Sequence, residues 1–100
     1  MNKGLLPVGT LVKLRMSKEK YCIIGFGVND KNTGRIYDYA AVTYPIGLQS
    51  LDDTVAFDEG MIKRVIHIGY VTPEDMEYRQ NVVDAINNFR NGTKVEEKSE

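Results

Sequence analysis

An aromatic segment near the middle of the chain most constrains the fold. Residues 37–44 read YDYAAVTY and run directly into Pro45-Ile46-Gly47. Three tyrosines within this short run suit the half-buried, pleated surface of a β-strand. Pro and Gly interrupt such a strand, because Pro lacks a backbone donor and Gly has no side chain to pack. The segment therefore predicts a strand that stops abruptly and is followed by a turn.

Four segments have the alternation or the apolar content that is typical of strands. They are residues 9–16, 21–28, 35–44 and 64–71. Residues 55–61 are ambiguous between a short strand and a single turn around Asp58-Glu59-Gly60. The turn formers of residues 29–34 predict a hairpin between the second and third strands. Gly25 and Gly27 predict a bulge, a bend or the close approach of another backbone segment in the second strand.

The C-terminal part of the chain predicts one amphipathic helix. Thr72 suits the N-cap, Pro73 the first helical position, and Asp75 the third position of a capping box. The apolar side of this helix comprises Met76, Val82, Val83, Ile86 and Phe89. Asn91-Gly92 predicts its end. Residues 93–100, which are mostly polar and charged, predict a flexible tail.

These elements predict a single α+β domain over residues 1–92. The sheet is expected to be small, twisted and antiparallel, with four to five strands, either open or curled into a half-open barrel. The C-terminal helix is expected to pack its apolar side against this sheet. Strands dominate the first two thirds and one helix follows them, which argues against repeated βαβ crossovers. A chain of 100 residues is near the common size of one domain.

Composition and charge exclude several classes of protein. The apolar fraction of 42% and the charged fraction of 27% are those of an ordinary globular domain. Thirteen basic residues stand against fourteen acidic ones, for a net charge of −1. A protein that grips nucleic acid usually carries a basic excess, so no nucleic acid is expected as a partner. No apolar run is long enough to span a membrane and no leader is evident, so a cytoplasmic location is expected.

The residues that carry chemistry are few. His67 and Cys22 are the only histidine and cysteine, and they cannot by themselves supply a catalytic triad or a zinc site. Four carboxylates gather in the later half, but without the alternating spacing of a calcium loop. They are Asp52, Asp53, Asp58 and Glu59. The sequence therefore predicts no catalytic residue, no metal and no cofactor, and hence a protein that is not an enzyme.

The connection over residues 45–54 has an unusual apolar content for a loop that is expected to face solvent. Its apolar side chains either fold back onto the sheet or bind a partner, and they are Ile46, Leu48 and Leu51. Tyr37, Tyr39 and Tyr44 have three interpretations. They pack against the sheet, form a protein-binding surface, or stack the bases of a single strand as small barrels do.

Arg79 is unusual because it lies within the apolar side of the predicted helix. An ion pair with Asp75, one turn earlier, is one explanation. Direct contact with a partner protein is the other. The predicted partner-binding set is therefore Tyr37, Tyr39, Tyr44, Ile46, Leu48, Leu51 and Arg79.

Several motifs together resemble a known family. They are LPVGTLVKL (residues 6–14), YCIIGFGV (21–28), YDYAAVTYPIG (37–47), and the later spacing of Phe57, Ile62, Val65, Gly69 and Tyr70. In these motifs the chain resembles the domain-of-unknown-function family 4176. Its members are encoded beside type VII secretion systems and LXG-type toxins of Gram-positive bacteria. The resemblance covers residues 5 to about 70.

The resemblance implies a non-catalytic accessory or chaperone-like protein, which binds a cognate LXG-type toxin and helps its export by the secretion system. Other small secretion accessory proteins are further expected partners. Two alternatives are an immunity protein that neutralises the toxin and a small barrel that binds single-stranded nucleic acid. A homodimer formed through an exposed edge strand also remains open.

Overall fold

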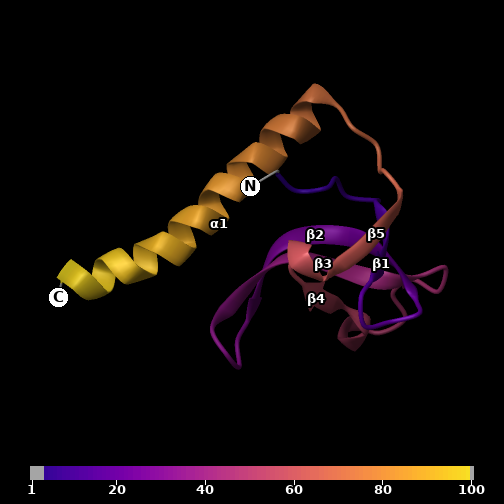
Figure 1. The fold of residues 1–100 in the computed structure, drawn as a ribbon, viewed down its shortest axis with the longest axis horizontal. Coiled ribbons are helices and arrows are strands. Elements are labelled where there is room, and N and C mark those ends of the chain that lie inside the picture. Colours follow the sequence, from indigo (N-terminus) through magenta and orange to yellow (C-terminus); the bar gives the residue numbers. More distant parts are fainter. Residues whose placement is uncertain (1–3, 100) are drawn as a thin grey trace.

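The computed structural model describes the backbone of residues 4–99 and the side chains of residues 4–91. It contains a five-stranded antiparallel sheet and one long helix (Figure 1). The elements are β1 (Leu11–Leu14), β2 (Lys20–Asp30), β3 (Arg35–Tyr44), β4 (Val55–Phe57), β5 (Ile62–His67) and α1 (Pro73–Ser99). The predicted α+β class is confirmed.

The sheet is strongly curled. Its strand order is β4-β3-β2-β1-β5, so β4 and β5 lie at opposite edges although they are consecutive in the chain. Only residues 58–61 join them, and these include the 3-10 turn η2 (Glu59–Met61). An extended chain covers at most about 3.5 Å per residue, so β4 ends within about 18 Å of the start of β5. The two edges therefore approach each other at this end, while no ladder joins them to close a barrel.

The β2–β3 hairpin follows from its turn chemistry. The Asp30 side chain accepts a hydrogen bond from the Asn32 backbone N–H at 2.9 Å, and the Asp30 carbonyl accepts one from the Gly34 N–H at 2.7 Å. Gly34 has φ of 73°, a left-handed conformation that suits glycine. The register slips once, between Ile23 and Gly25, which confirms the predicted irregularity in this strand.

Three strands differ from the prediction in their bounds. β1 occupies Leu11–Leu14 rather than residues 9–16, β2 occupies Lys20–Asp30 rather than residues 21–28, and β5 occupies Ile62–His67 rather than residues 64–71. The β1–β5 ladder ends at the pair Leu11↔His67. Beyond this pair, the Gly69 N–H donates to the Thr10 hydroxyl at 3.0 Å instead of to a strand carbonyl. A hydrogen bond to the Thr10 side chain therefore takes the place of the ladder, and β5 ends earlier than its alternating apolar residues predict.

The start of α1 is confirmed and its end is not. The Thr72 hydroxyl accepts a hydrogen bond from the Asp75 backbone N–H at 3.0 Å, as expected for an N-cap. The prediction that the helix ends at Asn91-Gly92 is wrong, because α1 continues to Ser99. One glycine costs a helix only about 1 kcal/mol relative to alanine. The residues after Gly92 include no proline, so the sequence offers no strong stop. The side chains of the predicted tail lie outside the described part.

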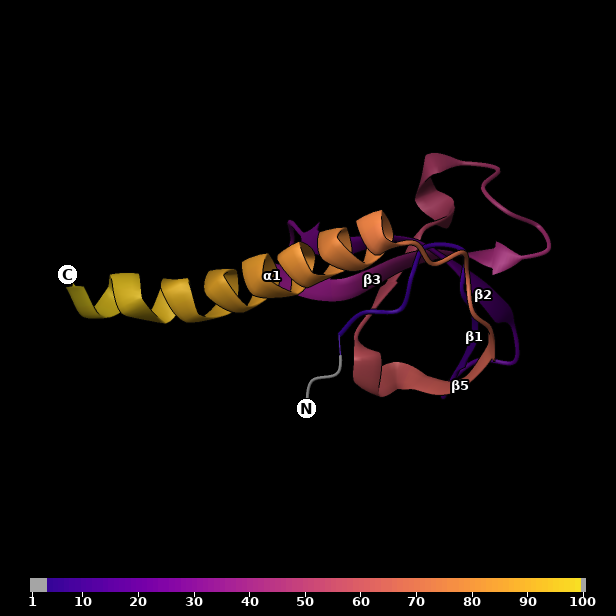
Figure 2. The same cartoon turned by 90° about the horizontal axis from the view of Figure 1, so that it is seen from above.

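The helix closes one face of the sheet. Ile86 is buried in the same cluster as Val12, Ile23 and Tyr39, and Val82 and Val83 pack against this cluster. Viewed from above, the helix runs over the β2–β3 hairpin, and its C-terminal end extends beyond the sheet (Figure 2). The single core therefore lies between the curled sheet and the N-terminal half of α1.

We expect Thr72→Ala to lower the free energy of unfolding by about 1 kcal/mol, because it removes the acceptor of the Asp75 backbone N–H in the first turn of the helix. Urea unfolding followed by circular dichroism measures this change. Thr54→Ala is the matched control, since the Thr54 side chain is exposed and makes no hydrogen bond within the described residues. Equal unfolding midpoints for the two variants would contradict the assigned cap.

Candidate functional site

The connection between β3 and β4 is shaped by its own hydrogen bonds. The Gly47 N–H donates to the Thr43 carbonyl at 2.8 Å, at a glycine with φ of 76°. Ser50 caps the 3-10 turn η1 (Leu51–Asp53). The Asp53 carboxylate accepts from the backbone N–H groups of Gln49 and Ser50, both at 2.9 Å. These local bonds order the backbone without burying its apolar side chains.

The apolar side chains of this connection face solvent. The exposed fractions are 46% for Tyr44, 58% for Ile46, 53% for Leu48 and 87% for Leu51. We name this group the apolar loop surface. The connection lies on the side of the molecule opposite to the C-terminal end of α1 (Figure 2). Of the two predicted alternatives, folding back onto the sheet is wrong for these residues, because they remain exposed. An ordered loop that presents several apolar side chains to solvent is typical of an interaction site.

The two other predicted tyrosines do not belong to this surface. Tyr39 is fully buried. Its hydroxyl donates to the Glu59 carboxylate at 2.5 Å and accepts from the Leu6 backbone N–H at 2.9 Å. Burial, and then the hydrogen bond to Glu59, raises the pKa of this hydroxyl above its ordinary value. Tyr37 is half-buried under the Arg35 guanidinium, whose carbon lies 4.8 Å from the ring centroid.

A polar network around Asp38 and Asp58 joins three elements. The Asp58 carboxylate accepts from the Asp38 backbone N–H at 3.0 Å and from the Arg35 guanidinium at 2.5 Å. Arg90, on α1, donates to the Ile36 carbonyl at 2.9 Å and lies 3.3 Å from the Asp38 carboxylate. Sequence reasoning missed this network, because residues from distant parts of the chain form it. The network connects α1 to β3 and to the turn after β4.

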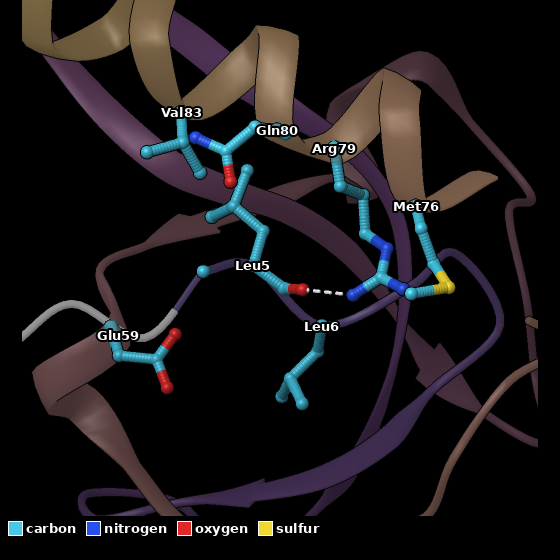
Figure 3. A pocket seen from close by; sticks show the side chains of 8 residues that line it. Leu5, Leu6, Glu59, Met76, Arg79, Gln80 and Val83 are labelled. Carbon is cyan, nitrogen blue, oxygen red and sulfur yellow. Dashed lines mark hydrogen bonds between the residues drawn. The ribbon is translucent and has the colours of Figure 1, made fainter. Parts of the chain in front are cut away.

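Arg79 has a structural partner on its own helix. Its guanidinium forms a bidentate pair with Asp75, with nitrogen–oxygen distances of 2.8 to 3.1 Å, and also donates to the Leu5 carbonyl. The first of the two explanations for Arg79 is therefore confirmed. Arg79 also lines a cavity of about 430 Å³ between the N-terminal segment and α1 (Figure 3). The lining residues are Gly4, Leu5, Leu6, Glu59, Met76, Arg79, Gln80 and Val83.

The polar groups at this cavity are already paired within the chain. Arg79 bonds to Asp75 and Leu5, and Glu59 accepts from Tyr39. His67 is exposed on β5 and Cys22 is half-buried on β2. Among the described residues, no group of three or more His, Cys, Asp or Glu side chains could hold a metal ion. Over the same range, the helix falls short of the length and apolar content that crossing a bilayer requires.

A comparison with known families identifies the chain. A family model described as Domain of unknown function (DUF4176) matches residues 5–78. The chain belongs to this family. No curated protein and no solved structure matches it. The DUF4176 match includes the sheet, the apolar loop surface and the first turns of α1.

The sequence motifs that resemble DUF4176 come together in the structure. Gly69, from the last motif, lies against residues 8–10 of the first motif, and its N–H donates to the buried Thr10 hydroxyl. Gly9 itself has φ of 93°, and its N–H donates to the Ile23 carbonyl at 2.8 Å. These motif residues therefore determine how the N-terminal segment, β2 and the end of β5 come together.

Proposed function

We propose that this DUF4176 protein is a non-catalytic accessory protein that binds a cognate LXG-type toxin and helps its export by a type VII secretion system. Its resemblance to family members encoded beside such toxins supports the toxin as the partner. The observation that carries the proposal is the apolar loop surface. Three apolar side chains on an ordered connection, together with Tyr44 at the end of β3, are all at least 46% exposed.

A protein partner explains this surface through elementary energetics. Apolar surface that leaves water contributes roughly 25 cal/mol per Å², so covering these side chains favours a complex. Hydrogen bonds within residues 43–53 order the loop before binding, which lowers the entropy cost of association. Exposed apolar anchors on an ordered backbone are the usual centre of a protein–protein interface.

Stacking of nucleic-acid bases is less well supported by the geometry. That alternative needs Tyr37 and Tyr39 on one accessible face, whereas Tyr39 is fully buried and Tyr37 lies under Arg35. Apart from Tyr44, the apolar loop surface consists of aliphatic side chains, which offer no flat face to a base. We therefore propose the protein partner.

We expect Leu48→Asp to weaken binding of the cognate toxin by at least about thirtyfold, because it places a charge within the apolar loop surface. Co-expression with the toxin, followed by affinity purification and isothermal titration calorimetry, measures the change. Tyr70→Asp is the matched control, since Tyr70 is another exposed apolar residue outside this surface. Unchanged toxin binding by Leu48→Asp would refute the assigned surface.

A second assay separates export from immunity. An accessory protein increases the soluble or secreted amount of toxin, and expressing it alone does not protect cells from the intact toxin domain. Growth rescue without any effect on secretion would contradict the proposed role and favour an immunity protein.

A further inference from the structure

Three basic residues lie in one row across three neighbouring strands. In the ladder register, Lys13 on β1 is directly opposite Lys20 on β2 and Arg64 on β5. Residues directly opposite in an antiparallel pair place their side chains on the same face of the sheet. Lys20 and Arg64 are exposed and Lys13 is partly exposed. We name these three residues the basic row.

The basic row is not neutralised within the described residues. All ion pairs there involve Arg35, Arg79 or Arg90. The Lys13 ammonium donates to the Lys18 carbonyl, which is uncharged. Residues 13–20 and 63–64 contain three further cations, Arg15, Lys18 and Lys63, and one carboxylate, Glu19.

Like charges that lie directly opposite each other destabilise a sheet. The chain as a whole has a net charge of −1, so this local concentration is an asymmetry of the surface rather than a general basic excess. A row of unpaired cations that costs stability in the free protein indicates an anionic partner.

The basic row leads into the apolar loop surface. Lys20 is directly opposite Tyr44 on β3, so Arg64, Lys13, Lys20 and Tyr44 follow one another across four strands. The strands β1 and β5 and the connection after β3 lie on the side of the molecule away from the C-terminal end of α1 (Figure 2). At the far end of the loop, Asp52 and Asp53 supply negative charge, with Asp53 bonded to backbone N–H groups. The combined surface is therefore cationic at its Tyr44 end.

We propose that the segment bound by the apolar loop surface is an acidic, amphipathic segment of a protein. Its apolar side chains cover Tyr44 and Leu48, and its carboxylates lie opposite Lys20, Lys13 and Arg64. This inference rests on the proposed function, because it assigns the chemistry of the partner at the same site. Tyr44 is the one aromatic side chain of this surface and its other three anchors are aliphatic, which favours a protein segment over nucleic acid, whose bases need several stacking platforms. Complementary charge of this kind sets orientation and raises the association rate.

An amide NMR titration with defined probes tests the proposal independently of the toxin. The probe is a short peptide in which Leu and Glu alternate, and the control peptide has Lys in place of Glu. A thymidine oligonucleotide of equal length tests nucleic acid. We expect shifts at residues 13, 20, 44 and 64 with the Glu peptide alone, which weaken as salt is added. Absence of these shifts, or stronger binding of the Lys peptide or the oligonucleotide, would overturn the proposal.

Charge reversal separates this proposal from the proposed function. We expect the double variant Lys20→Glu, Arg64→Glu to bind the Glu peptide and the toxin roughly tenfold more weakly or worse. Its melting temperature should not fall, since the changes relieve repulsion with Lys13. Lys31→Glu, at the exposed tip of the β2–β3 hairpin, is the control.

If Leu48→Asp abolishes toxin binding while the double variant binds both ligands normally, the acidic segment is wrong and the proposed function stands. If the toxin does not bind the wild type, the proposed function fails. In that case the peptide titration alone tests whether the basic row and the apolar loop surface bind an acidic segment.

Discussion

Gly69→Ala is expected to lower the free energy of unfolding by about 3 kcal/mol or more, enough to unfold much of the protein. A Cβ atom at this position would lie 2.2 Å from the Val8 carbonyl oxygen and 3.0 Å from backbone atoms of Gly9 and Thr10. All three contacts are with main chain, so no side-chain rotation relieves them. The backbone itself must move.

That movement is costly because the opposing segment is held on both sides. The Gly9 N–H donates to the Ile23 carbonyl at 2.8 Å, and the Ile23 N–H donates to the Thr10 carbonyl at 2.9 Å. Thr10 is fully buried, and its hydroxyl accepts from the Gly69 N–H. Retreat of residues 8–10 would break these bonds and open the core beside Ile23.

Urea unfolding followed by circular dichroism measures the effect. Gly60→Ala is the matched control, because a Cβ atom there would meet no heavy atom within 4 Å and the φ of Gly60 is not in the left-handed region. This control should change the free energy of unfolding by about 1 kcal/mol or less. If the two alanine variants were equally stable, the close approach of Gly69 to residues 8–10 would be wrong.

Tyr39→Ala is expected to lower the free energy of unfolding by about 3–5 kcal/mol, since it empties the space of a fully buried aromatic side chain. The ring lies 5.4 Å from Phe57 and 6.1 Å from Phe26, measured between ring centroids. Tyr39→Phe keeps the ring but leaves the Leu6 N–H and the Glu59 carboxylate without their partner. We expect it to cost about 1–3 kcal/mol.

The same unfolding measurement compares these variants with Tyr37→Phe, a control whose hydroxyl makes no hydrogen bond within the described residues. Alkaline pH gives a second readout. The pKa of Tyr39 is higher in the folded than in the unfolded protein, so the stability that its buried hydroxyl contributes is fully present below the ordinary value of 10.0. This stability is lost as pH rises from 10.0 through the raised pKa. The stability difference between wild type and Tyr39→Phe should therefore shrink above about pH 10. A difference that stays constant would contradict the buried hydrogen-bonded hydroxyl.

Part of the candidate site was predictable from the sequence. The apolar residues of the 45–54 connection, unusual for a loop, marked it as either buried or partner-binding, and the structure leaves them exposed. The sequence could not show which of Tyr37 and Tyr39 is buried. They have the same strand parity, and only the curl of the sheet and the position of α1 bury one ring more deeply than the other. The basic row was also hidden, because Lys13, Lys20 and Arg64 become neighbours only through strand register.

Features that depend on neighbouring residues follow from the sequence alone. These include the bounds of β3, the turn of the β2–β3 hairpin and the Thr72 cap of α1. Each rests on turn, strand or capping preferences that act over a few residues. Other features arise only in the folded chain, namely the end of the β1–β5 ladder, the contact of Gly69 with residues 8–10 and the alignment of the basic row. They join segments far apart in the chain, so their geometry is set by packing and register, which local preferences do not specify.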